Sequence, residues 1–328
     1  MATTVLTGSR GLPAAGVARS LLAQPIYVFV IACLMFFSLG SPYFLAVQNF
    51  QDILVQSSTI GLIALGMTFV MIDGNIDLSV GSVTSLSACL AVGLQGYGIL
   101  PAVLAALVAG ALLGLLNGVL VWKTGVDSFI VTLGAMIGIR GIVFLYTREQ
   151  SFATLNMAYT DFGSSMVGPI PTLGLLLLVA AAMLWWLLNH TLHGRNTFAV
   201  GGNRQAAINA GVRVGRHMVV NFVLVALCAS LAGITLSSQM GAATPNLGRG
   251  FELWTITAVV LGGTKLSGGS GSIIGTLGGV FAIGILRNGM DLMHVSSFYV
   301  LVVMGVVLIS VLFLDKQFGS RGLRGLSL

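Results

Sequence analysis

The chain has 328 residues, of which 56% are hydrophobic and only 7% are charged. An average soluble domain carries roughly 25% charged residues, so this composition excludes an ordinary soluble enzyme and indicates a protein embedded in a membrane. The formal charge of +6 could suggest an anionic partner. The positions of the basic residues indicate membrane topology instead, and we expect no nucleic acid to bind.

Apolar runs long enough, or nearly long enough, to cross about 30 Å of hydrocarbon recur along the chain. The run between Arg249 and Lys265 is doubtful, since as a helix it reaches only roughly 22 Å, and it could be tilted, broken or re-entrant. The sequence therefore predicts an all-α, polytopic membrane protein of about ten transmembrane helices. The predicted spans are residues 24–40, 52–72, 79–97, 99–121, 127–147, 171–189, 217–238, 251–264, 271–290 and 296–314.

Basic residues fall mainly on one side if these spans alternate from a cytoplasmic amino terminus. Cytoplasmic segments are enriched in Lys and Arg, so this bias supports the orientation. We expect one transmembrane domain, 24–314, with a cytoplasmic loop at 190–217, between cytoplasmic segments 1–23 and 315–328. The residues on that side are Arg10, Arg19, Lys123, Arg195, Arg204, Arg213, Arg216, Lys265, Lys316, Arg321 and Arg324.

Glycines four residues apart predict close packing of helices, because they form smooth stripes. These stripes are Gly110, Gly114 and Gly118; Gly134 and Gly138; and Gly271, Gly275 and Gly279. Residues 74–82 also resemble residues 262–270, and each segment is a glycine-rich break between two apolar runs. They are either an internal repeat with broken helices, as in many transporters, or two similar tight turns.

Few side chains within the spans could carry chemistry. Asp73 and Asp77 could form an intramembrane carboxylate pair, but Gly74 separates them, and Asp77 or Ser79 is better placed to cap the next helix. Arg140 lies inside the fifth span, where it needs a partner: Glu252, helix-end carbonyls, or a polyhydroxylated ligand.

Neither a metal site nor a disulfide framework is supported by the spacing of the relevant residues. The cysteines, Cys33, Cys89 and Cys228, each lie within an apolar run. His190 and His193 have no carboxylate or cysteine nearby to complete a metal site. We therefore expect no bound metal.

The longest hydrophilic interruption, from His190 to His217, contains a predicted short helix. Asn203 can cap its amino end, residues 204–210 form two turns, and Gly211 supplies a left-handed carboxyl cap. So short a helix needs a surface to dock against. Either a partner protein receives it, with Ala206 and Ala207 entering a groove, or the basic loop lies on anionic lipid.

The sequence contains no motif for ATP hydrolysis or for catalysis. A phosphate-binding loop of the Gly-x-x-x-x-Gly-Lys-Ser/Thr type is absent, as are a Ser/His/Asp set and a dinucleotide-binding Gly-x-Gly-x-x-Gly unit. We expect no catalytic site, so any ATP hydrolysis must come from another chain.

Several strings, in order between about residues 50 and 312, resemble the ribose-type permeases of bacterial ATP-binding cassette sugar importers. Two positions depart from that family's pattern: Gly74-Asn75, where it usually has two glycines, and Asp127-Ser128, where it commonly has a proline before the phenylalanine. The matching strings are residues 61–68 (GLIALGMT), 75–82 (NIDLSVGS), 129–134 (FIVTLG), 140–141 (RG), 199–203 (AVGGN), 206–207 (AA), 260–264 (VLGGT) and 266–269 (LSGG).

The resemblance implies an inner-membrane permease that pairs with a second copy or a paralogue. Its partners would be membrane lipid, two ATPase subunits that bind ATP and Mg, and a periplasmic sugar-binding protein. A branched-chain amino acid-type ATP-binding cassette permease and, in a different class, an autonomous ion-coupled carrier or channel are the alternatives.

The resemblance also implies three groups of functional residues. The implied ATPase-coupling helix uses Gly201, Gly202, Asn203, Arg204, Ala206, Ala207 and Gly211. The implied translocation pathway uses Phe129, Thr132, Leu133, Met136 and Arg140. The implied structural and gating loops use Asp77, Ser79, Gly81, Lys265, Ser267 and Gly269.

Overall fold

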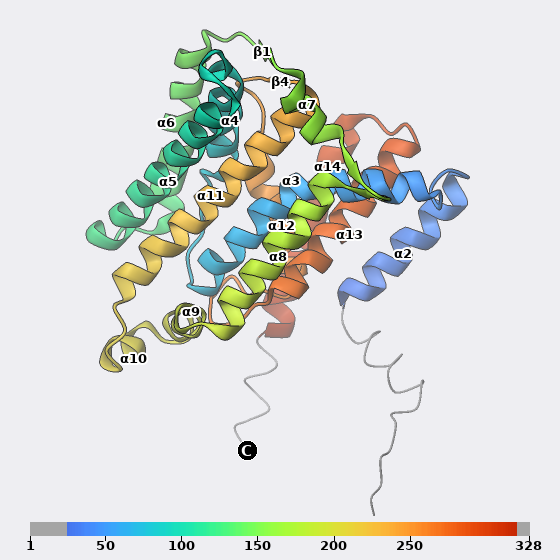
Figure 1. Cartoon of the computed structure of the whole chain (residues 1–328). Helices are drawn as coiled ribbons and strands as arrows, with labels where there is room; N and C mark the ends of the chain where they lie inside the picture. The colour runs from blue at the N-terminus through green and yellow to red at the C-terminus, as the bar shows by residue number, and fades with distance from the viewer. Residues whose placement is uncertain (1–24, 320–328) are drawn as a thin grey trace, which may run out of the picture.

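A computed structural model describes residues 25–319 of the chain, and these residues form a mostly helical bundle (Figure 1). Six helices are long and apolar enough to cross a membrane: α3 (Val47–Ile72), α5 (Ile99–Thr124), α6 (Ser128–Thr147), α8 (Thr172–His190), α11 (Val214–Met240) and α13 (Ile273–Leu292). Four further apolar helices are α2 (Pro25–Gly40), α4 (Val80–Gly93), α12 (Phe251–Leu261) and α14 (Ser297–Gly319).

Each predicted span overlaps one of these helices, but two helices are short. The predicted span 79–97 contains α4, with 14 residues, and then a separate 3-10 turn, η1 (Gln95–Tyr97). The run 251–264 contains α12, which has 11 residues and stops at Gly262. Both short helices adjoin a glycine-rich break, because α4 follows residues 73–79 and α12 precedes residues 262–272.

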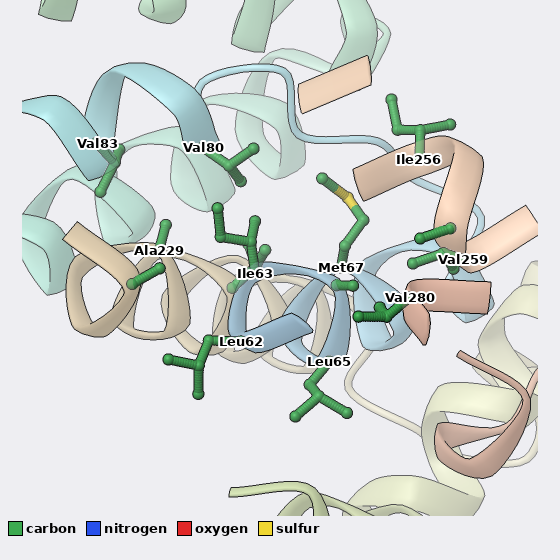
Figure 2. Packing of buried hydrophobic residues seen from close by; sticks show 14 of the residues in the cluster. Leu62, Ile63, Leu65, Met67, Val80, Val83, Ala229, Ile256, Val259 and Val280 are labelled. Atoms are coloured by element: carbon green, nitrogen blue, oxygen red, sulfur yellow. The ribbon is translucent and has the colours of Figure 1, made fainter. Parts of the chain in front are cut away.

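Helix α3 lies at the centre of the bundle, and most of its residues are buried. Side chains of α3, among them Ile63 and Met67, sit among residues of α4, α12 and α13 (Figure 2). Helix α11 packs along α3 and α5. Burial on all sides explains why the carboxyl-terminal half of α3, residues 60–72, is almost entirely apolar.

Two of the three predicted glycine stripes pack against a neighbouring helix, although Gly271 of the last stripe lies in the loop before α13 and not on the helix as predicted. A Cβ added to Gly114 would lie 2.7 Å from the Cβ of Ala226 and 2.9 Å from the Cα of Val223, both on α11. A Cβ on Gly279 would collide with the carbonyl of Ala258 on α12. The third stripe differs, since Gly134 and Gly138 have no neighbour within 4 Å, and the packing prediction for α6 is wrong within this chain.

Several elements were not predicted, although the described residues are mostly helical, as expected. Two pairs of very short strands are present, and two further helices cover the ends of the bundle. The strands are β1 (Phe152–Ala153) with β4 (Ala242–Ala243), and β2 (Met166–Val167) with β3 (Ile170–Pro171). The helices are α7 (Met157–Ser164) and α9 (Leu192–Gly202).

The two ends of the bundle differ in structure. Helices α9 and α10 (Arg204–Asn209) lie together at one end, whereas α7, β1 and β4 lie at the other (Figure 1). The predicted segment 1–23 lies outside the described residues, and most of segment 315–328 does as well.

Candidate functional site

Helix α10 has the boundaries that its capping residues predict. The side chain of Asn203 accepts a hydrogen bond from the backbone N–H of Ala206 at 2.9 Å. Gly211 follows the helix with φ of 81°, and its N–H donates to the carbonyl of Ile208 at 2.9 Å. These contacts satisfy free backbone groups at both ends of a helix of only six residues.

One side of α10 is packed against this chain and the other is open. Ala207 is only 4% exposed and forms a small apolar cluster with Val200 and Val214. Ala206 is exposed, and so is Ile208, at 48%. The two alanines therefore face different surroundings, and an open face with an isoleucine is available to a partner. Sequence reasoning missed Ile208, although its place beside the alanine pair was visible.

Helix α9, which precedes α10, is held on α11 through polar contacts. The ring of His193 hydrogen-bonds Asn221 Oδ1 through Nε2 at 2.8 Å, and its Nδ1 lies 3.1 Å from Nδ1 of His217. Asn196 Nδ2 lies 3.0 Å from the other ring nitrogen of His217. Partial burial lowers the pKa of His193 below its ordinary value of 6.5, although the bond to Asn221 opposes this shift. Burial therefore favours the neutral imidazole of His193.

Basic residues line a cavity next to the carboxyl end of α10. A cavity of ≈ 630 Å³ between α9 and the start of α11 is lined by Arg213, Arg216 and both histidines, His193 and His217. Lys123 lies in the last turn of α5, and Lys265 is exposed in the loop after α12. Within residues 25–319, no three His, Cys, Asp or Glu side chains gather as metal ligands would.

The loop between α3 and α4 is held by a buried polar cluster. Asp77 Oδ1 accepts from the backbone N–H of Ser79 at 2.8 Å and from its hydroxyl at 2.6 Å. Asn117 of α5 donates to the same hydroxyl at 2.9 Å. Ser79 occupies the amino-cap position of α4, but no side chain accepts a hydrogen bond from the first turn, so the capping prediction is wrong in detail. Asp77 instead fixes the conformation of Ser79, just before the helix. A Cβ on Gly81 would collide with the carbonyl of Gly248, so this glycine permits a close approach of the segment before α12.

The same loop is tied to helix α6. The backbone N–H of Ile76 donates to Ser128 Oγ at 3.1 Å, and that of Leu78 donates to Thr132 Oγ1 at 3.1 Å. Thr132 is fully buried in this contact. Because of these two hydrogen bonds, a movement of the loop would also displace α6.

The loop between α12 and α13 carries the remaining loop candidates. Lys265 and Ser267 are exposed. The backbone N–H of Gly269 donates to the carbonyl of Ile72, the last residue of α3, at 2.8 Å. Ser272 then caps α13 by accepting from the N–H of Gly275 at 2.9 Å. The structure thus brings the two glycine-rich loops together.

Helix α6 presents an open face. Phe129 is 48% exposed, whereas Leu133 and Met136 are partly exposed. Gly134 and Gly138 meet nothing within 4 Å. This face can accept another helix or line a passage.

Arg140, farther along α6, is hydrogen-bonded to the segment before α12. Its Nη1 donates to the carbonyls of Pro245 at 2.7 Å and Leu247 at 3.0 Å. The structure shows backbone carbonyls as its partners, but they belong to the turn before α12 and not to a helix end, as the sequence had suggested.

A helical bundle with apolar outer faces and a basic end that carries a docked short helix defines a multi-pass membrane protein. The chain belongs to the permease family described as the branched-chain amino acid transport system permease component, whose model matches residues 49–312.

Individual relatives cover most of the chain. The ribose import permease protein of Bacillus subtilis (strain 168) is 42% identical over 284 residues, which are 85% of this chain and 88% of the relative. The D-allose transport system permease protein of Escherichia coli (strain K12) is 37% identical over 294 residues, 88% of this chain and 90% of the relative. An L-arabinose permease protein of Azospirillum brasilense is 36% identical over 279 residues, 84% and 82% of the two chains. No solved structure matches the chain.

Proposed function

We propose that this chain is the permease subunit of an ATP-binding cassette importer and forms the translocation pathway for a monosaccharide or related polyol. The family description names branched-chain amino acids, but the relatives named above carry ribose, D-allose and L-arabinose in their names. The observation that carries the proposal is the open face of α10, on a helix too short to be stable without a surface to dock against.

The ATPase subunits bind at α10 and hydrolyse ATP with Mg, while this chain binds neither. The exposed Ala206 and Ile208 offer a small, apolar contact to a groove on the ATPase. A periplasmic sugar-binding protein delivers substrate at the opposite end. Basic residues around α10 support a cytoplasmic location for this end, because cytoplasmic segments are enriched in Lys and Arg.

The chain crosses the bacterial inner membrane ten times, with both termini in the cytoplasm. Ten apolar helices among residues 25–319 support this number, although α4 and α12 are too short to cross alone. The breaks beside these two helices form the related loops of an internal repeat. Lipid covers the exposed apolar side chains of the outer helices.

A second permease copy or a paralogue faces helix α6, and substrate passes between the two subunits. The open face of α6 supports this arrangement, since Gly134 and Gly138 leave room for a close approach. Phe129, Leu133 and Met136 line the pathway on that face. Thr132 and Arg140 hold α6 in place through their contacts with the loops on either side of it.

Transport follows from a shift between two packings of the helices. Closure of the ATPase subunits around ATP displaces α10, and the loaded binding protein selects the state that is open to the periplasm. Each ligand shifts the equilibrium only by its difference in affinity for the two states.

Ala206→Glu tests the docking of α10. The variant places a charge on the open face without touching the cluster of Ala207, Val200 and Val214. We expect the variant to reach the membrane normally but to lose the ATPase subunit on purification and to lose uptake. Ala158→Glu, at an exposed alanine of the short helix α7, is the matched control and retains the ATPase. Retention of the ATPase and of uptake by Ala206→Glu would refute the coupling assignment.

A further inference from the structure

Three backbone segments contact one another with no side chains between them near the amino end of α10. They are the end of α3, the end of α9 and the loop before α13. Gly201, near the end of α9, packs so closely on the end of α3 that an added Cβ would collide with the carbonyl of Ile72. The same Cβ would lie 2.7 Å from the N of Gly269 in the loop before α13. The N–H of Gly269 in turn donates to the Ile72 carbonyl at 2.8 Å. One glycine of α9 thus contacts both partners of a single hydrogen bond.

The second half of the contact is also made by glycines. A Cβ on Gly268 would lie 2.9 Å from Gly74 Cα and 3.1 Å from the carbonyl oxygen of Gly201. Gly268 has φ of 81° and Gly74 also has φ of 81°, a backbone conformation that other residues adopt only with strain. We call Gly74, Gly201, Gly268, Gly269 and the carbonyl of Ile72 the glycine junction.

Backbone contacts of this kind transmit displacement well. A long side chain can absorb a shift by changing rotamer, whereas glycines in contact have no such freedom, and packed interiors are hardly compressible. Gly201 lies two residues before Asn203, the amino cap of α10. A displacement of α10 therefore reaches the junction through one short stretch of backbone.

The junction leads on to the proposed pathway helix. From Gly74 the chain continues to Ile76 and Leu78, whose N–H groups donate to Ser128 and Thr132 of α6. From Gly269 the chain continues to Ser272, which caps α13. Both glycine-rich loops are thus linked to α9 at one point, and each is linked onward to a membrane helix.

We infer that Gly201 is a positioning residue through which the coupling segment moves both glycine-rich loops, residues 73–79 and 262–272, as one unit with α6 and α13. This inference deepens the proposed function and rests on it. The contacts of Gly201 with Ile72 and Gly269 convert docking of the ATPase into movement of the helices.

The test compares Gly201→Ala with Gly305→Ala in the complex of this chain, its ATPase and its binding protein. Gly305 lies in α14, and a Cβ added to it meets nothing within 4 Å. We expect Gly201→Ala to retain the ATPase, to lose stimulation of ATP hydrolysis by loaded binding protein, and to lower uptake by about tenfold, a usual size for coupling between sites. Gly305→Ala should behave as wild type. Normal uptake and stimulation in Gly201→Ala would overturn the inference.

Hydrogen exchange on the unmodified complex gives an answer that does not depend on the folding of a variant. Adding ATP with vanadate should change the exchange of residues 72–78, 199–203 and 266–271 together. A change in 199–203 alone would overturn the inference and leave the proposed function standing. Failure of the unmodified chain to bind any ATPase would instead refute the proposed function, and the inference with it.

Discussion

The guanidinium of Arg140 and the carbonyl of Pro245 are joined by a 2.7 Å hydrogen bond that links α6 to the loop before α12. The same nitrogen donates to Leu247 at 3.0 Å. A charged donor inside a membrane helix is costly without partners, so these two carbonyls account for its presence. They also fix the position of α6, whose neighbouring face we propose as the pathway lining.

Arg140→Ala should therefore destabilise the chain. It removes two hydrogen bonds from a charged donor, which contribute about 3–6 kcal/mol together. We expect a lower unfolding temperature in detergent, measured by tryptophan fluorescence, and reduced uptake. Arg140→Lys should recover only part of the loss, because an ammonium group cannot reproduce the planar geometry of a guanidinium. An unchanged unfolding temperature in Arg140→Ala would contradict this account of the residue.

Gly114→Ala tests the contact between α5 and α11. The new methyl group would lie 2.7 Å from the Cβ of Ala226, closer than van der Waals contact allows. Overpacking of this kind costs about 1–3 kcal/mol. Gly305→Ala in α14 is the control, because nothing lies within 4 Å of its added Cβ. If both variants unfold at the wild-type temperature, the helices are farther apart than described.

Tyr159→Phe tests how α7 is held on the bundle. The Tyr159 hydroxyl lies 2.9 Å from the carbonyl of Ile234 and 2.7 Å from Ser237 Oγ, both on α11. Its removal should cost about 1 kcal/mol and increase hydrogen exchange in α7. Tyr97→Phe, at a side chain that is 81% exposed, should have no effect on either measurement. Equal exchange in α7 for wild type and Tyr159→Phe would count against this anchoring.

His193 predicts a dependence of stability on pH. Burial lowers its pKa in the folded chain below 6.5, so at low pH the unfolded chain binds more protons than the folded chain. Stability is therefore complete above the unfolded pKa and is lost on acidification below it. We expect the unfolding temperature to fall between about pH 7.5 and about pH 5.5, and to fall less in His193→Gln. Equal falls in the two proteins would assign the effect to other groups.

Local sequence chemistry predicted some elements well. The ends of α10 follow from Asn203 and Gly211, because caps depend on residues only a few positions apart. Helix α9 was missed since its sequence is polar and rich in glycine. It is stabilised by contacts that are distant in sequence, such as His193 with Asn221.

Glycine stripes with the same spacing in the sequence pack differently in the structure. The stripe at Gly114 packs on α11, whereas the stripe at Gly134 meets nothing, and only the arrangement of helices decides between them. The contact of Gly201 with Gly269 joins segments that are far apart in the chain, so no local pattern could predict it. Ala207 was expected on a partner surface together with Ala206, but its burial depends on Val200 and Val214.

The most direct measurement of the central claim is the side of the membrane on which α10 lies. A single cysteine is placed at Gln205 on α10, or at Ala158 on α7 as the control, after Cys33, Cys89 and Cys228 have been replaced. Intact cells, with the outer membrane permeabilised, are treated with a maleimide that cannot cross the inner membrane. The account predicts that position 158 is labelled at once and position 205 only after the inner membrane is opened. Labelling of position 205 in intact cells would place α10 away from any cytoplasmic ATPase and contradict the account.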